Sequence, residues 1–369
     1  MLKLFHSFVA LSFFSLSASA LKWKTHDISS LLVEEANGTS YQDVNGKTMP
    51  LETIIKNGGA NSVRIRLWVG PADGNYNLEY ALKLAARVKA AGLGIHLNLH
   101  YSDTWADPGK QGKPAAWSSL STTALVEQVK SYTKSVLDAF AAHSMDVQLI
   151  SLGNEIRAGL LWPNGKWDQF PTMAKLLHAG VAGVKASKIS SKPKIMLHLD
   201  RGYDWSTQEW FYDNLIAANF DLSSIDVQGV SCYPFWDKTN STLANFKTNM
   251  YNMAAKYKKA IVCTETDWPT KCTKASDNIP PSLTEAFPFS AAGQKAWMKA
   301  LAAIVKGIPG GLGKGVMYWE PAWVNNPSLG SACESSVLFS ATSSGGKAVA
   351  KALSYVSPLP PYRYMGVIG

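Results

Sequence analysis

The sequence feature that most constrains the fold is a repeated alternation of a short apolar run with a longer segment of helical periodicity. Each short run suits a β-strand, and each longer segment can lay one apolar face against a sheet. Repetition of this unit favours parallel strands, because a helix returns the chain to the start of the next strand. The strand candidates are residues 23–28, 62–69, 94–99, 147–152, 194–199, 226–231, 260–264 and 315–319.

The helical segments between these runs show the same pattern throughout. In residues 78–91, Leu78, Leu82, Ala85 and Val88 share one face before Gly92 ends the helix. Four other segments behave alike: 123–142, 172–187, 243–259 and 291–305. Eight strands with eight intervening or trailing helices predict a closed (β/α)8 TIM barrel. The sequence contains no linker-like or low-complexity tract, so we expect a single domain over residues 21–369.

The first twenty residues are typical of a signal peptide. Lys3 precedes an apolar stretch, and Ala18-Ser19-Ala20 offers a cleavage site. The stretch is too short to span a bilayer, and no later window is long and apolar enough either. We therefore expect a secreted, extracellular protein that has no membrane partner. We also expect it to act as a monomer.

The net charge of +9 does not indicate nucleic acid as a partner. The basic residues are scattered, whereas a groove that follows phosphates needs a basic stripe. Asn37-Gly38-Thr39 and Asn240-Ser241-Thr242 are candidate glycan acceptors at Asn37 and Asn240.

Four cysteines allow three complete pairings. Cys272 and Cys333 lie in polar segments after apolar strands, which favours a disulfide between two loops. Cys232 and Cys263 lie inside apolar strands. If Tyr233 and Glu265 both point into the barrel, strand alternation turns Cys263 inward and Cys232 outward. These two thiols should then remain free.

Polar or aromatic side chains end nearly every predicted strand, where barrel enzymes place their chemistry. These residues are Asp27, Arg64, Arg66, His100, Asp103, Asn154, Glu155, His198, Asp200, Tyr233, Glu265, Trp319 and Glu320. A barrel that served only as a structural core would not need this set.

Two of these residues predict hydrolysis of glycosidic bonds. Glu155 ends the fourth strand and Glu265 the seventh, so their carboxyl groups can converge over the mouth of the barrel. Most glycosidases need such a pair, with one carboxyl protonated and the other ionised. A single glutamate at a strand end is more often half of an ordinary ion pair, but two on these strands favour catalysis.

Neighbouring residues suit supporting roles. Asn154 can donate to a sugar 2-hydroxyl, or it can cap the turn. Tyr233 and Arg66 can donate to Glu265 and stabilise its carboxylate, although Arg66 also suits a structural ion pair. Trp319 can form the floor under the attacked sugar, or it can fill the barrel.

Seven segments resemble the arabinogalactan endo-β-1,4-galactanases of glycoside hydrolase family 53. The segments occur in the order of that family, and the resemblance runs from about Lys24 to about Val356. They are Asp27-Ile28-Ser29-Ser30, Asp103-Thr104-Trp105-Ala106-Asp107-Pro108, Gly153-Asn154-Glu155-Ile156-Arg157-Ala158-Gly159-Leu160-Leu161-Trp162-Pro163, His198-Leu199-Asp200, Tyr233-Pro234-Phe235, Thr264-Glu265-Thr266-Asp267-Trp268-Pro269 and Tyr318-Trp319-Glu320-Pro321-Ala322-Trp323. The resemblance implies a retaining endo-acting enzyme on a TIM barrel. Its expected partner is a polysaccharide, the β-1,4-galactan of galactan and type I arabinogalactan side chains of pectin.

The resemblance also assigns residues. Glu155 matches the acid/base of the family and Glu265 its nucleophile. The residues that match positions around the reacting sugar are Asp27, Arg66, His100, Asn154, Tyr233 and Trp319. Those that match sugar-binding positions are Trp105, Asp200 and Trp323.

The loop after the seventh strand bears on metals. Bacterial members of the family often hold calcium there, but residues 270–288 carry only Asp277 and Glu285, too few oxygens for a calcium cage. Cys272 in this loop instead resembles the fungal members, with a disulfide to Cys333. We therefore expect no metal and no cofactor.

Two other functions remain open from the sequence. Another retaining β-1,4-glycanase, such as a mannanase or cellulase, would share the Asn-Glu pair and the second glutamate. A non-catalytic wall-binding barrel would usually have lost a catalytic carboxylate, whereas both are present here.

Overall fold

The computed structural model describes residues 20–273, 278–324, 333, 335–344 and 347–352. Of the predicted signal peptide, residues 1–19 lie outside the described residues, as does the chain after residue 352. Asp277, one of the two acidic residues of the loop considered for calcium, lies outside them as well. Among the described residues, no helix has the length and apolar character needed to cross a membrane.

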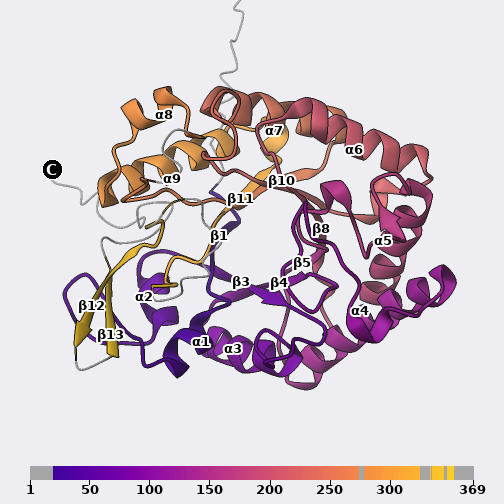
Figure 1. The fold of residues 1–369 in the computed structure, drawn as a ribbon, viewed down its shortest axis with the longest axis horizontal. Helices are drawn as coiled ribbons and strands as arrows, with labels where there is room; N and C mark the ends of the chain where they lie inside the picture. Colours follow the sequence, from indigo (N-terminus) through magenta and orange to yellow (C-terminus); the bar gives the residue numbers. More distant parts are fainter. Residues whose placement is uncertain (1–19, 274–277, 325–332, 334, 345–346, 353–369) are drawn as a thin grey trace, which may run out of the picture.

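Eight parallel strands close into a barrel, which confirms the predicted fold (Figure 1). The order around the barrel is β1-β11-β10-β9-β8-β5-β4-β3, closed by pairing of β1 with β3. Every predicted strand is present, with ends that shift by up to two residues. The strands are β1 (Trp23–Asp27), β3 (Ser62–Leu67), β4 (Gly94–Leu99), β5 (Leu149–Leu152), β8 (Lys194–Leu199), β9 (Val227–Ser231), β10 (Ala260–Glu265) and β11 (Gly313–Tyr318).

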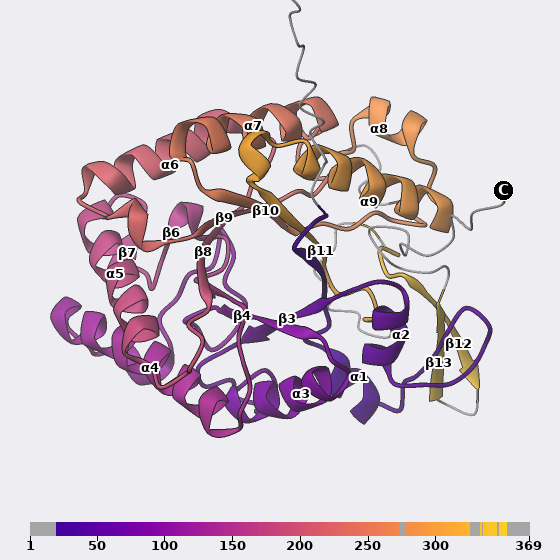
Figure 2. The ribbon, with the colours of Figure 1, turned by 180° about the vertical axis from the view of Figure 1, so that it is seen from behind.

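Helices surround the barrel on its outside, as both end views show (Figures 1 and 2). The five predicted helices are present within two residues of their expected ends. The helices are α1 (Leu31–Ala36), α2 (Leu51–Asn57), α3 (Leu78–Ala90), α4 (Thr122–Ala142), α5 (Phe170–Ala186), α6 (Trp205–Ala217), α7 (Leu243–Tyr257), α8 (Pro281–Ala286) and α9 (Ala291–Lys306). Asn77, Ser121, Thr242 and Ser290 cap α3, α4, α7 and α9 through side-chain oxygens, which fixes where these helices begin.

The core has two layers, because alternate residues of each strand face opposite sides. Inside the barrel, a compact apolar cluster fills the lower part: Trp23, Leu149, Met196, Val227, Val262 and Met317. A larger cluster lies between the strands and the helices. The interior above Met196 is polar, with His96, Asn98 and His198 all buried. Polar groups therefore occupy the end of the barrel at which the strands finish.

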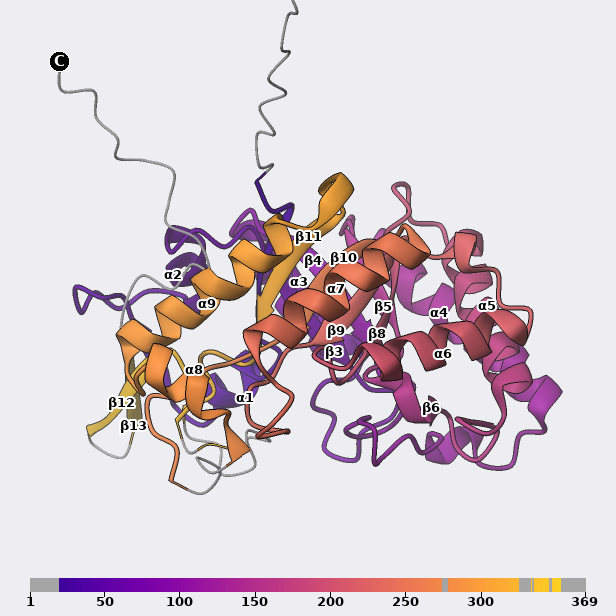
Figure 3. The ribbon, with the colours of Figure 1, turned by 90° about the horizontal axis from the view of Figure 1, so that it is seen from above.

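After β11, the described residues contain a hairpin in place of the expected trailing helix. Strands β12 (Phe339–Ser344) and β13 (Lys347–Ala352) pair antiparallel, and β13 pairs parallel with β2 (Ser40–Gln42). A second hairpin, β6 (Gly159–Leu160) with β7 (Gly165–Lys166), follows β5. Seen from the side, β6, α8 and β12 lie toward the same edge of the molecule (Figure 3). These elements follow β5, β10 and β11, so this edge is the carboxyl end of the barrel.

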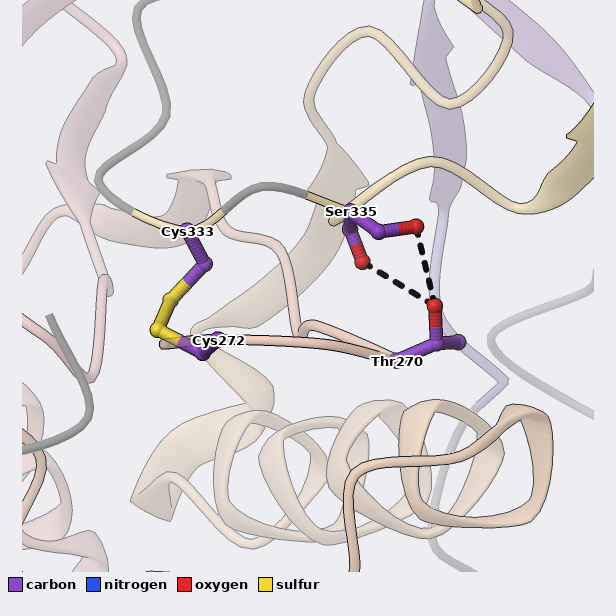
Figure 4. The surroundings of a disulfide bond; sticks show 4 residues. All are labelled: Thr270, Cys272, Cys333 and Ser335. Atoms are coloured by element: carbon purple, nitrogen blue, oxygen red, sulfur yellow. Dashed lines mark hydrogen bonds between the residues drawn. A yellow bond between two sulfur atoms is a disulfide. The ribbon is translucent and has the colours of Figure 1, made fainter. Parts of the chain in front are cut away.

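The predicted disulfide between Cys272 and Cys333 is present (Figure 4). It joins the loop after β10 to the segment after β11. Beside it, the Thr270 hydroxyl lies 2.9 Å from the Ser335 hydroxyl and donates to the Ser335 carbonyl at 3.3 Å. The Thr270 amide donates to the same carbonyl. The disulfide therefore reinforces an existing contact between two loops at the carboxyl end of the barrel.

Cys232 and Cys263 are free and buried, as predicted, but the expected inward direction of Cys263 is wrong. Val262 belongs to the cluster inside the barrel, and Cys263 belongs to the outer cluster with Cys232. The register between β9 and β10 shifts between Cys263 and Glu265. This irregularity breaks the two-residue alternation, so Glu265 reaches the barrel mouth without carrying Cys263 inward.

Both candidate glycan acceptors, Asn37 and Asn240, lie on the surface. The Asn240 side-chain nitrogen donates to Asp237 within the loop that leads to α7. Exposure is a requirement for glycosylation, and glycosylation itself stays a prediction for both residues.

Candidate active site

A cleft of about 650 Å³ opens at the carboxyl end of the barrel strands. Most of the predicted site residues line it: Arg66, His100, Trp105, Asn154, Glu155, Asp200, Tyr233, Glu265 and Trp319. Other residues line it too: Arg64, Ala106, Asp107, Pro108, Lys110, Arg157, Arg201, Tyr203, Ser231, Phe235 and Trp236. Asp27 and Trp323 are buried behind this surface and do not line it.

Glu155 lies in a tight turn directly after β5. Its backbone is left-handed, with φ of 46°, a conformation that residues other than glycine rarely adopt. Gly153 has φ of 89°, and a Cβ there would come within 2.4 Å of Ile156. Gln111 donates from its side chain to the Asn154 carbonyl at 2.8 Å. The glycine and this hydrogen bond together hold the turn that directs Glu155 into the cleft.

The Glu155 carboxyl group is half-buried and faces the second predicted glutamate. An oxygen of Glu155 and an oxygen of Glu265 lie within 4.8 Å of each other. The Ser231 hydroxyl lies 2.5 Å from Glu155 Oε1. Burial raises the pKa of Glu155 well above its usual range, and the negative charges of Glu265 and Asp200 raise it further. This carboxyl group is therefore suited to hold a proton near neutral pH.

Glu265, the last residue of β10, has donors on both of its oxygens. Arg64 approaches Oε1 at 2.7 Å, and the Tyr233 hydroxyl donates to Oε2 at 3.0 Å, as predicted for Tyr233. Burial raises the pKa of Glu265, while Arg64 and Tyr233 act against that rise. The two glutamates thus differ in surroundings: a cation and a phenol favour the ionised form of Glu265, whereas no cation among the described residues forms an ion pair with Glu155.

Arg64 donates to Glu265, the role that was predicted for Arg66. Its guanidinium forms a buried fork that reaches Asp27 at 2.7 Å, Glu265 at 2.7 Å and Asn154 Oδ1 at 2.7 Å. Residues two apart on β3 share the inner face, so alternation alone does not separate these two arginines. Asp27 is buried, pairs with Arg64 and does not line the cleft.

Arg66 forms a different pair. Its guanidinium lies 3.0 Å from Glu320 and donates to the Ser30 hydroxyl at 3.1 Å. It also stacks on the Tyr76 and Trp105 rings, with its central carbon 4.3 Å and 4.2 Å from the ring centres. The predicted bond from Arg66 to Glu265 is wrong, and the alternative of an ion pair for Arg66 is confirmed, because its guanidinium contacts Glu320 and the two rings.

The orientation of the Asn154 amide follows from its partners. Oδ1 faces Arg64, which can only donate, and Nδ2 faces the Ala106 carbonyl at 2.7 Å, which can only accept. Nδ2 keeps a second hydrogen. Since Asn154 lines the cleft, that hydrogen can serve a sugar hydroxyl, which is the role predicted from the sequence.

His100 is arranged to donate as well. Its Nδ1 accepts from the Ala106 amide at 3.1 Å and from the Trp68 indole at 3.3 Å. Burial lowers the pKa of His100 well below its usual range, with further lowering by Arg66 and Arg64. A neutral ring with Nδ1 as acceptor carries its hydrogen on Nε2, so His100 can donate into the cleft.

Aromatic rings form the walls of the cleft. Trp105 packs against Trp319, at 6.2 Å between ring centres, and stacks on Trp323, at 6.1 Å and 22° between planes. Trp323 therefore supports Trp105 from behind. Trp236 is 58% exposed at the rim, and it is the most exposed of the large apolar residues in the described chain. Such rings suit the apolar faces of sugars.

Asp200 lines the cleft as one half of an ion pair with Arg157. Both of its oxygens accept from Arg157 Nε, at 2.8 Å and 3.0 Å. Arg157 lies two residues after Glu155, in the short helical turn Ile156–Ala158. The ion pair ties the loop after β8 to the loop that carries Glu155.

The sequence analysis named Arg64 among the polar residues at the strand ends but gave it no role, and it named neither Ser231 nor Trp236. Arg64 had a visible signal, since it is a polar residue on the inner face of a strand beside Arg66. Ser231 ends β9 two residues before Tyr233, a parity that places it on the inner face. Trp236 lies in a loop, where its exposure has no sequence signal.

The chain matches the family model described as Glycosyl hydrolase family 53 over residues 23–353. It is 48% identical over 324 residues to the arabinogalactan endo-beta-1,4-galactanase A of Aspergillus niger, covering 88% of this chain and 91% of that protein. The corresponding protein of Emericella nidulans is 45% identical over 333 residues, covering 90% and 94%.

Solved structures agree with this match. A structure described in work on two fungal beta-1,4-galactanases superposes with a TM-score of 0.85 at 43% identity, covering 91% of this chain and 98% of that one. A family 53 catalytic domain of Ignisphaera aggregans superposes with a TM-score of 0.78 at 28% identity, covering 95% and 98%. The chain belongs to glycosyl hydrolase family 53 and is a glycoside hydrolase.

Proposed function

We propose that this protein is a secreted endo-β-1,4-galactanase that cleaves internal β-1,4-galactosyl linkages in galactan and in type I arabinogalactan side chains of pectin. The observation that carries the proposal is the pair of glutamates with oxygens within 4.8 Å, in a chain 48% identical to a protein named for this activity. The substrate is a neutral polysaccharide, and neither nucleic acid nor a membrane is a partner. The protein acts as a monomer and uses no cofactor.

The proposed reaction proceeds by double displacement with retention. Glu155 donates its proton to the leaving glycosidic oxygen while the Glu265 carboxylate attacks the anomeric carbon. The bond to the leaving sugar breaks and a covalent glycosyl-enzyme forms. Glu155, now ionised, takes a proton from water, and the resulting hydroxide displaces Glu265. Both glutamates then have their starting protonation states.

The spacing of the carboxyl groups supports retention over inversion. Retaining enzymes hold the two groups about 5–5.5 Å apart, whereas inverting enzymes hold them about 6.5–9.5 Å apart to admit a water molecule. One oxygen of Glu155 lies within 4.8 Å of one oxygen of Glu265, a spacing compatible with the retaining arrangement. The electrostatics agree, because Arg64 and Tyr233 favour a charged Glu265, whereas within the described part of the chain no cation pairs with Glu155.

Secretion fits other features of the chain. The signal peptide at residues 1–20 would be removed, leaving residues 21–369 as the catalytic domain. A disulfide such as Cys272–Cys333 is typical of oxidising, extracellular surroundings. Two exposed acceptor asparagines, Asn37 and Asn240, are compatible with passage through a glycosylating pathway.

A reducing-sugar assay on galactan, mannan and β-glucan tests the proposal. We expect release of oligosaccharides from galactan, with activity lost in Glu155→Gln and in Glu265→Gln. Higher activity on mannan or β-glucan would favour a different β-1,4-glycanase. Binding to a wall polysaccharide without any hydrolysis would favour a non-catalytic barrel.

A further inference from the structure

A buried chain of hydrogen bonds leads from Glu155 into the barrel. Ser231 Oγ lies 2.5 Å from Glu155 Oε1 and 2.9 Å from His198 Nε2. His198 Nδ1 lies 3.1 Å from Asn154 Oδ1. Ser231 is 3% exposed and His198 is fully buried, so bulk water does not compete for these contacts.

The direction of each hydrogen bond follows from the far end of the chain. Asn154 Oδ1 is an acceptor, because the same oxygen faces the Arg64 guanidinium. His198 must therefore donate from Nδ1. Burial lowers the pKa of His198 well below its usual range, and Arg64 lowers it further, so the ring is neutral and Nε2 has only a lone pair. The Ser231 hydroxyl must then donate to Nε2.

The consequence concerns Glu155. The Ser231 hydroxyl has one hydrogen, and donation to His198 uses it. The oxygen of Ser231 can then only accept from Glu155, which requires the carboxyl group to be protonated. If Glu155 is ionised instead, Ser231 donates to its carboxylate, an arrangement that lowers the pKa of Glu155. His198 Nε2 then loses its donor in a buried site, and that loss opposes the ionised form.

We propose that Ser231 and His198 are positioning residues that favour the protonated form of Glu155, the form that donates to the leaving group. This inference rests on the proposed function of Glu155 and adds two residues to it. In the second half of the reaction the same chain favours the return of a proton to Glu155, because that proton restores every hydrogen bond from Glu155 to Asn154.

Other charged groups also act on Glu155, and the test leaves them unchanged. Glu265 faces it from β10, Asp200 from the loop after β8, and Asp107 from the loop after β4. All three raise the pKa of Glu155. The Arg64 guanidinium contacts Glu265 at 2.7 Å. A variant of Ser231 alters none of these charges, so any shift in the pH profile reports the hydrogen-bond chain.

The experiment is the pH dependence of kcat/KM on galactan for the full-length secreted enzyme. We expect the midpoint of the alkaline limb to fall by about 0.5–1 pH unit in Ser231→Ala, the worth of one hydrogen bond to the protonated form. Ser231→Thr keeps the hydroxyl and should restore the wild-type midpoint. Ser151→Ala is the matched control, since it removes a serine–histidine contact of 2.8 Å, to His96, that does not touch Glu155.

An unchanged or raised midpoint in Ser231→Ala would overturn the proposal, because it would mean that Ser231 donates to an ionised Glu155. A fall of equal size in Ser231→Thr or in Ser151→Ala would overturn it as well. A neutron crystal structure of the wild-type enzyme, determined at a pH where kcat/KM is at its plateau, gives a second measurement. It should locate a hydrogen on Glu155 and a Ser231 hydrogen directed at His198, and the opposite arrangement would refute the chain.

A second substrate separates this inference from the proposed function. A dinitrophenyl β-galactobioside has a leaving group that needs no proton. On that substrate, kcat/KM of the wild-type enzyme should therefore fall little as the pH rises through the alkaline limb seen on galactan. The same limb on both substrates would mean that Glu155 is not the proton donor. A limb found on galactan alone, with no downward shift in Ser231→Ala, would leave Glu155 as the acid and refute only the hydrogen-bond chain.

Discussion

Replacing Arg64 by methionine should disable the proposed nucleophile by changing its charge state. The Arg64 guanidinium lies 2.7 Å from Glu265 and is 1% exposed. With charge centres about 4 Å apart and an effective dielectric constant of about 20, the attraction is about 4 kcal/mol. One pH unit corresponds to about 1.4 kcal/mol, so this attraction sets a ceiling of about 3 units on the shift.

The expected shift is smaller, at about 1–2 pH units, because carboxylates beside arginine in proteins move by about 1–3 units and water can enter the vacated space. Its sign is upward. Glu265 attacks only when ionised, so a higher pKa of Glu265 moves the acid limb of kcat/KM toward higher pH. The assay is the initial rate on galactan across the pH range, and Arg64→Lys, which keeps the charge, should shift the limb less.

Loss of Arg64 also leaves Asp27 as an unpaired buried charge, which lowers the free energy of unfolding by about 3–5 kcal/mol. The double variant Arg64→Met with Asp27→Asn removes that charge. It should recover much of the stability while the acid limb stays displaced. An acid limb in the wild-type position, in a folded Arg64→Met variant, would refute the assignment of Arg64 as the residue that keeps Glu265 ionised.

Three further predictions concern the surrounding structure. Thiol counting in denaturant without reductant should find two free thiols, from Cys232 and Cys263, and a count of zero or four would contradict the pairing described above. Changing both Cys272 and Cys333 to serine should lower the free energy of unfolding in denaturant by up to about 4 kcal/mol, the chain-entropy value for the 61-residue separation. Burial raises the pKa of Glu320 to about 8 although Arg66 acts to lower it, so below that pH the carboxyl group binds a proton more tightly in the folded than in the unfolded protein. Wild type should therefore lose stability relative to Glu320→Gln as the pH rises from about 5 to about 8, measured as Tm, and a constant difference would contradict the raised pKa.

Much of the barrel was predictable because its signals are local. Eight apolar runs and the helical periodicities between them gave strands and helices within two residues of their observed ends. The β2–β12–β13 sheet had no comparable signal. The composition of its strands resembles that of exposed loops. Strand β13 pairs with β2 because the fold brings together two segments that are distant in the sequence.

The site was predictable in its residue types but less so in its partners. Strand ends identified Glu155, Glu265 and Tyr233, since parity and position suffice for them. The choice between Arg64 and Arg66 depended on the direction of two identical side chains on the same face, which the sequence does not contain.

The direction of Cys263 failed for a related reason. A single irregularity in the pairing of β9 and β10 changes the parity of every later residue in that strand. Nothing in the segment from Ala260 to Glu265 marks where that irregularity falls.

The account depends most on the separate roles of the two glutamates, and azide rescue tests them directly. With a dinitrophenyl β-galactobioside, Glu155→Ala should still form the glycosyl-enzyme, because this leaving group needs no acid. Azide needs no base, so it should restore turnover and give a galactosyl azide of β configuration after two inversions. In Glu265→Ala, azide can attack only from the vacated face and should give the α-azide. Exchange of the two product configurations would contradict the assignment of Glu155 as acid/base and Glu265 as nucleophile.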